Sequence, residues 1–156
     1  AIYRHFDNKR AILSTILAQF QEKMKSFTST LEQTPKNTFE KIESLLHHFR
    51  SIFEANPAIV SVIFAEEIFQ NDNELARAVA TILESNQQFL INMIVEGQAQ
   101  NEIRPELDKQ MIVDSIFGPF RLMVKKWKMN HFSVSLQENV ETFLDYLRST
   151  IFVSPE

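Results

Sequence analysis

The sequence predicts an all-α fold, a bundle of about six helices. Only two glycines occur among 156 residues, whereas sheet proteins use glycine in turns and bulges. Apolar residues recur at intervals of three and four through nearly the whole chain, which is the period of an amphipathic helix. No segment shows the alternating pattern of a half-buried strand. The length suits one domain with a substantial core.

Three helices are expected in the first half of the chain. Asn8 is a candidate N-cap, and the apolar stripe after it predicts a helix over residues 9–32. A second apolar stripe runs from residue 39 to residue 53 and ends before Pro57. Residues 58–69 are apolar on nearly every side, so they predict a helix buried near the centre.

Three more helices are expected in the second half. Asn71 and Glu74 have capping-box spacing ahead of a long helix that ends near Asn101. Another helix spans residues 107–129, where Gly118-Pro119 predicts either a kink or a loop between two shorter helices. A second capping box, Ser135 with Glu138, opens the last helix.

Composition excludes several functional classes. The absence of cysteine removes disulfides, thiolate zinc sites and cysteine nucleophiles, and it favours a reducing, cytoplasmic location. The longest unbroken apolar run has four residues, too short to cross a membrane. Gly97 and Gly118 stand apart, so glycine-rich phosphate loops are excluded.

The charge is unevenly distributed along the chain. Residues 1–10 contain three basic groups and one acid, a local charge of +2, while the whole chain carries −4. The remaining residues therefore carry −6, the difference between −4 and +2. A basic end on an acidic body predicts that any nucleic-acid contact lies at the N-terminus.

The first residues carry a motif. Tyr3-x-His5-Phe6-x-x-Lys9, followed directly by an apolar helix, resembles the end of the DNA-binding helix-turn-helix in TetR-family (AcrR-like) transcriptional repressors. Residues 95–108 resemble the turn after that family's long seventh helix. Residues 117–127 and 136–153 resemble its eighth and ninth helices. The resemblance covers the chain in order.

The resemblance implies that the chain has two functional parts. Residues 1–8 correspond to the end of the recognition helix, and residues 9–156 to a TetR-like ligand-binding and dimerisation domain. In the family, residues at the positions of Tyr3, His5 and Lys9 contact the DNA backbone. With the neighbouring Arg4, these are the candidate DNA-binding residues. The family places 40–50 further residues before Ala1, so we expect two short helices and a glycine-containing turn upstream.

Large apolar side chains gather on the inward faces of successive helices. Phe and Met at helical spacing form either a close-packed core or the wall of a large apolar cavity. The resemblance favours a pocket for an apolar inducer, without any other cofactor. The candidate pocket residues are Phe20, Met24, Phe53, Phe64, Phe89, Met93 and Phe117, together with the polar groups Glu67, Asn86 and Arg121. An alternative is that Glu67 and Arg121 pair with each other.

The last two helices each carry apolar residues beyond those that one core-facing stripe requires. Such a surplus predicts a homodimer, because soluble monomers avoid a large exposed apolar patch. The candidate interface residues are Ile116, Phe120, Met123, Trp127, Val140, Phe143, Leu144 and Leu147.

No catalytic or metal site is visible in the sequence. His47 and His48 point about 100° apart on a helix and are poorly placed to share a metal. The favoured interpretation is a ligand-responsive repressor that releases operator DNA. The alternative is a helical lipid or acyl-chain carrier, or an adaptor without DNA function. A carrier has no use for the N-terminal cluster, and an enzyme ranks third.

Overall fold

The computed structural model describes residues 2–65 and 70–154, and the side chains of the first helix from Asn8 onward. The helices are α1 (Ile2–Gln33), α2 (Thr38–Ala55), α3 (Pro57–Ile63), α5 (Asn73–Ala99), α6 (Lys109–Met129) and α7 (Leu136–Thr150). In this part of the chain the only β pairing is the isolated bridge between Ile103 and Phe152. The predicted all-α class is confirmed.

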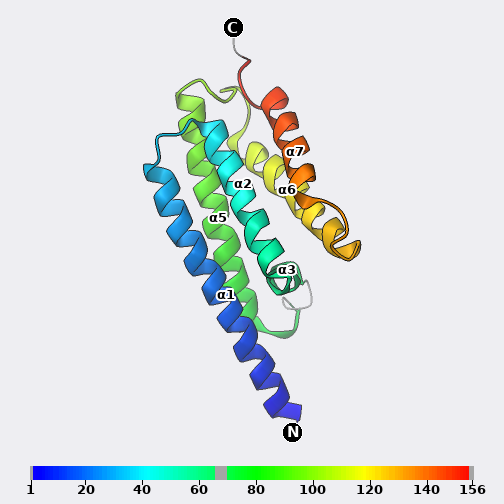
Figure 1. Cartoon of the computed structure of the whole chain (residues 1–156). Coiled ribbons are helices and arrows are strands. Elements are labelled where there is room, and N and C mark those ends of the chain that lie inside the picture. The colour runs from blue at the N-terminus through cyan, green and yellow to red at the C-terminus, as the bar shows by residue number, and fades with distance from the viewer. Residues whose placement is uncertain (1, 66–69, 155–156) are drawn as a thin grey trace.

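Three long helices form the body of the molecule. Figure 1 shows α1, α2 and α5 running alongside one another, with α6 and α7 together on one side. Helix α2 provides the centre of the core, where Ile42, Leu45, Leu46 and Phe49 are buried. The N-terminal part of α1 projects beyond the body (Figure 1).

Helix α1 is longer than predicted. It begins at Ile2 and continues without interruption to Gln33, so the expected helix start at Asn8 is wrong. No glycine or proline occurs in residues 2–33 to break the backbone hydrogen-bond ladder. One continuous helix therefore links the N-terminal motif to the body.

The caps explain where the other helices begin. Asn37 and Glu40 form a reciprocal capping box at α2 that the sequence reading missed. Helix α5 is capped by Asp72, not by Asn71 as predicted, because the Asp72 carboxylate accepts hydrogen bonds from the next helical N–H groups. Ser135 caps α7 as predicted by accepting a hydrogen bond from the Glu138 N–H, but the Glu138 side chain does not return a bond, so only half of the predicted capping box forms.

Two predicted helices have different extents in the structure. Helix α3 ends at Ile63, well before residue 69, and residues 66–69 lie outside the described residues. Helix α6 continues through Pro119, so the alternative of a loop between two shorter helices is wrong. Proline removes one hydrogen bond to the residue four positions earlier, here Ser115, which is exposed and therefore accessible to water.

His48 is expected to make the free energy of unfolding depend on pH. Its ring stacks on Phe27 with the centroids 3.8 Å apart, and its Nε2 is buried without a hydrogen-bond partner among the described residues. Burial, with a smaller effect from the charge of Lys23, lowers the pKa of His48 below 6.5, against the opposing effect of the Lys23 backbone. Protonation therefore favours the unfolded chain.

We expect the stabilising effect of neutral His48 to be complete above the unfolded pKa of about 6.5 and to be lost as the pH falls below it. Urea unfolding on both sides of this pH should show a smaller pH dependence for His48→Gln than for the wild type. His47→Gln, on the neighbouring residue, is the control. Equal pH dependence in all three proteins would contradict this assignment.

Candidate ligand-binding site

Aromatic side chains from several helices meet at the centre of the bundle. Phe20 of α1 lies 6.3 Å from Phe49 and 6.1 Å from Phe53, both on α2, between ring centroids. Phe120 of α6 lies 6.0 Å from Phe49, and Phe64 at the end of α3 lies 6.0 Å from Phe53. The helical spacing seen in the sequence therefore brings four helices to one aromatic cluster.

A cavity of about 340 Å³ opens beside this cluster. That volume falls within the range of small-molecule pockets. The walls come from α1, α2, α5 and α6 and from the end of α3: Phe20, Phe49, Phe53, Ile63, Phe64, Leu83, Asn86, Gln87, Asp114, Phe117, Gly118, Phe120 and Arg121. The lining is thus mostly aromatic and aliphatic, with a few polar groups.

The polar groups of the cavity lie toward solvent. Asn86 is half-buried, whereas Gln87, Asp114 and Arg121 are exposed. The Arg121 guanidinium carbon lies 5.3 Å from the centre of the Phe64 ring, a cation–π distance. The cavity therefore has an apolar interior and a polar rim that carries one positive and one negative side chain.

A second cavity of about 380 Å³ lies between α1 and α5. Most of its lining residues are polar types, with amides, hydroxyls and Lys25 around an apolar floor. Its lining residues are Gln21, Met24, Lys25, Thr28, Ile82, Ser85, Asn86, Gln88, Phe89 and Asn92. Asn86 belongs to both cavities, so the aromatic and the polar cavity adjoin at this residue.

The structure divides the predicted pocket residues into three groups. Six of them line the aromatic cavity: Phe20, Phe53, Phe64, Asn86, Phe117 and Arg121. Met24 and Phe89 line the polar cavity instead, and Met93 is buried in the core and lines neither. Glu67 lies outside the described residues.

The aromatic cavity also contains residues outside the candidate set. Phe49 was recognised as an inward-facing side chain on the same α2 stripe as Phe53, and it lines the cavity. Phe120 was assigned to the dimer interface, and Ile63 and Leu83 carried no sequence signal that separates a cavity wall from ordinary core. Whether an apolar residue lines a cavity or fills the core depends on how the helices cross. The periodicity of a single helix carries no information about that crossing.

The predicted dimer residues lie elsewhere than expected. Ile116, Phe120, Trp127, Val140, Phe143, Leu144 and Leu147 are buried within the single chain, and Met123 is half-buried. They pack against the rest of the bundle, so the inference that a monomer leaves them exposed is wrong. The exposed apolar side chains of α6 and α7 are Met111, Leu122, Met129 and Tyr146.

The predicted DNA-contacting residues lie at the projecting end of α1. The backbone of Tyr3, Arg4 and His5 is helical, and their side chains lie outside the described residues. Lys9 is exposed on the same helix. The motif is therefore on a continuous helix that reaches the cavity wall at Phe20.

The part of the chain that the structure describes contains neither a candidate metal-ligand cluster nor a helix that could span a membrane. There, His, Asp and Glu side chains form no group of three or more that could hold a metal ion. In the same residues, no helix combines the length and apolar character that crossing a bilayer requires.

A helical bundle with an aromatic cavity, joined by one continuous helix to a basic end, has the architecture of a ligand-binding helical domain. The C-terminal region described for YsiA-like proteins matches residues 20–149. The chain belongs to the TetR family of transcriptional regulators, within the group defined by that region.

Individual relatives agree with this assignment. The fatty acid metabolism regulator protein of Bacillus subtilis (strain 168) is 30% identical over 155 residues, which cover 96% of this chain and 77% of that protein. The crystal structure of FadR from Bacillus subtilis in complex with stearoyl-CoA has a TM-score of 0.74 at 27% identity, covering 95% and 79% of the two chains. A TetR regulator from Chloroflexus aurantiacus shares the fold, with a TM-score of 0.75 at 21% identity, covering 99% and 79%.

Proposed function

We propose that this chain is the sensor of a TetR-type repressor that binds a long-chain fatty acyl-CoA and then releases operator DNA. The aromatic cavity carries the proposal, since six phenylalanines and two aliphatic residues form its walls. Transfer of an acyl chain from water to such a lining is favourable in free energy. The B. subtilis relative solved with stearoyl-CoA supports the choice of ligand class.

The adjoining polar cavity accounts for the rest of such a ligand. Amides of Gln21, Gln88 and Asn92 provide donors and acceptors that suit the amide groups of pantetheine, and Lys25 is a cation for phosphate. We propose that the acyl chain occupies the aromatic cavity and that the polar part passes Asn86 into the polar cavity. The ligand then contacts α1 directly.

Binding of stearoyl-CoA is expected to raise the melting temperature of the chain. Because a ligand that binds only the folded state stabilises it by mass action, a concentration of 100 times Kd adds about 2.7 kcal/mol. Differential scanning fluorimetry measures this shift. Free CoA and stearate can each occupy only one of the two cavities, so each should raise the melting temperature less than stearoyl-CoA does. No shift with stearoyl-CoA would exclude this ligand class.

Asn86→Phe is expected to weaken stearoyl-CoA binding about tenfold or more, because the larger side chain fills the junction of the two cavities. Glu84→Phe places the same side chain at an exposed position on α5 that lines neither cavity. It should bind as the wild type does. Equal affinity of both variants would place the ligand elsewhere.

We further propose a homodimer through the outer face of α6. Met111, Leu122 and Met129 are exposed and lie within about 20° of one another around the helix axis, at 100° per residue. Gly118 lies on the same face and permits close approach of a second helix. Figure 1 places α6 and α7 together at one side of the molecule, where a second copy can reach both.

The regulatory mechanism follows from these parts. A two-fold dimer presents recognition helices to successive major grooves, about 34–36 Å apart. Residues 1–8 belong to the DNA-reading end and residues 9–156 to the sensor in this proposal. A ligand that prefers a different position of α1 changes the spacing and lowers operator affinity, by no more than its differential affinity for the two positions. The chain acts as a regulator and not as an enzyme.

A further inference from the structure

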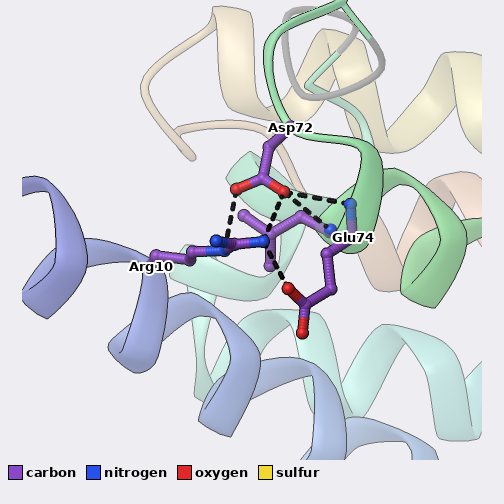
Figure 2. Close-up of polar contacts among 4 residues, drawn as sticks. Arg10, Asp72 and Glu74 are labelled. Carbon is purple, nitrogen blue, oxygen red and sulfur yellow. Dashed lines mark hydrogen bonds and ion pairs between the residues drawn. The ribbon is translucent and has the colours of Figure 1, made fainter.

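An ion-pair network joins the projecting end of α1 to the start of α5. Figure 2 shows Arg10 of α1 directed toward Asp72 and Glu74 at the beginning of α5. Arg10 Nη2 donates to Asp72 Oδ1 at 3.1 Å, and Arg10 Nε lies 3.1 Å from Asp72 Oδ2. The same Nη2 also contacts the Glu74 carboxylate. Arginine thus binds both oxygens of Asp72, a geometry that lysine cannot reproduce.

The Asp72 carboxylate is also held in place by contacts that do not involve Arg10. Its Oδ1 also accepts hydrogen bonds from the backbone N–H groups of Glu74 and Leu75, both at 3.1 Å, as the N-cap of α5. The Asp72 side chain is only 10% exposed, and that of Arg10 is 36% exposed. The pair is therefore more geometrically defined than an ordinary surface ion pair, whose contribution is small.

Arg10 lies on the N-terminal side of the residues that pack α1 into the core. Among the described residues of α1, the apolar packing begins with Leu13, half-buried, and the first fully buried side chain is Leu17. Arg10 precedes Leu17 by seven residues, about 10 Å along a helix axis. A contact that far toward the DNA-reading end acts on the tilt of α1 at a point beyond the core contacts.

The other side of the pair lies close in sequence to the ligand cavity. Ile63 and Phe64 line the aromatic cavity, and Asp72 follows Phe64 by eight residues. Helix α5 itself lines both cavities further along, at Leu83 and Asn86. A ligand in these cavities therefore contacts both elements that flank Asp72, as well as α1.

We propose that Arg10 is a positioning residue: its bidentate pair with Asp72 sets the position of the N-terminal part of α1 against α5 and thereby transmits ligand binding to the DNA-reading end. The transmission part rests on the proposed function. The positional part does not, because it concerns the geometry of the chain alone.

Two conservative variants isolate the ion pair. Arg10→Lys keeps the charge and removes the bidentate contact. Asp72→Asn keeps an equally good N-cap while leaving one acceptor oxygen in place of two. Arg77→Lys, at an exposed position on α5, is the matched control. Circular dichroism should show all three variants folded, with the helix content of the wild type.

The position of α1 is measured by electron–electron distance measurements on spin labels. The chain has no cysteine, so Asn8→Cys on α1 and Glu84→Cys on α5, both exposed, label cleanly. In spin-diluted samples, Arg10→Lys and Asp72→Asn should broaden and shift the distance distribution, whereas Arg77→Lys should match the wild type. Unchanged distributions in both pair variants would overturn the proposal.

The transmission is measured in the full-length regulator as the ratio of operator Kd with and without saturating stearoyl-CoA. We expect this ratio to fall at least threefold in Arg10→Lys and Asp72→Asn, and to remain unchanged in Arg77→Lys. An unchanged ratio in both pair variants overturns the transmission role. If stearoyl-CoA leaves the wild-type operator Kd unaltered, the proposed function fails, while the spin-label distances still decide the positional role.

Discussion

Leu122→Glu is expected to convert the proposed homodimer into a folded monomer. Leu122 is 51% exposed in the single chain, so a charge there is tolerated without a partner. In a two-fold interface centred on α6, each new carboxylate loses water and faces its own copy, and such like-charge contacts cost several kcal/mol. A loss of about 3 kcal/mol weakens association more than 100-fold. Sedimentation at micromolar concentration measures the change.

Ile12→Glu is the control for this experiment, because Ile12 is 60% exposed on α1, away from the α6 face. It should remain dimeric. Phe143→Glu is unsuitable, since Phe143 is only 6% exposed within the chain and the change would disrupt folding instead of association. A dimeric Leu122→Glu protein, or a wild type that sediments as a monomer, would refute the α6 interface and the groove-spacing mechanism that depends on it.

Gly97→Val is expected to lower the free energy of unfolding by roughly 2–4 kcal/mol, as overpacking of a filled core does. A Cβ at Gly97 lies 2.9 Å from both Cγ2 and Oγ1 of Thr38 and 3.0 Å from Cδ1 of Ile103. Thr38 and Ile103 are themselves buried, so neither can move aside freely. In a domain of this size the melting temperature should fall by roughly 4–16 °C.

Glu96→Ala, one residue earlier on α5, is the matched control. Glu96 is exposed and forms only a local hydrogen bond with Gln100, so its loss should change stability by about 0.5 kcal/mol or less. Urea unfolding compares the two variants. If Gly97→Val is as stable as Glu96→Ala, the close contact between α5 and the start of α2 is not present in solution.

The order and type of the helices are determined by the sequence itself. The apolar period of three to four residues depends only on local geometry, and it predicted α2, α5, α6 and α7 to within a few residues. The N-terminal motif likewise pointed to the TetR family, which the comparisons confirm. Local signals were weaker at the caps, where Asn71 and Asp72 are both good N-caps and only the backbone shows which is used.

Tertiary structure alone decided which apolar residues face a cavity, the core or solvent. Phe120 and Phe143 are as apolar as any interface residue, yet the first lines the aromatic cavity and both are buried by the packing of α6 and α7 on the bundle. Periodicity defines a helical face but not its neighbour, because that depends on how the helices cross. The pair between Arg10 and Asp72 joins residues 62 apart in sequence, so no local pattern could have predicted it.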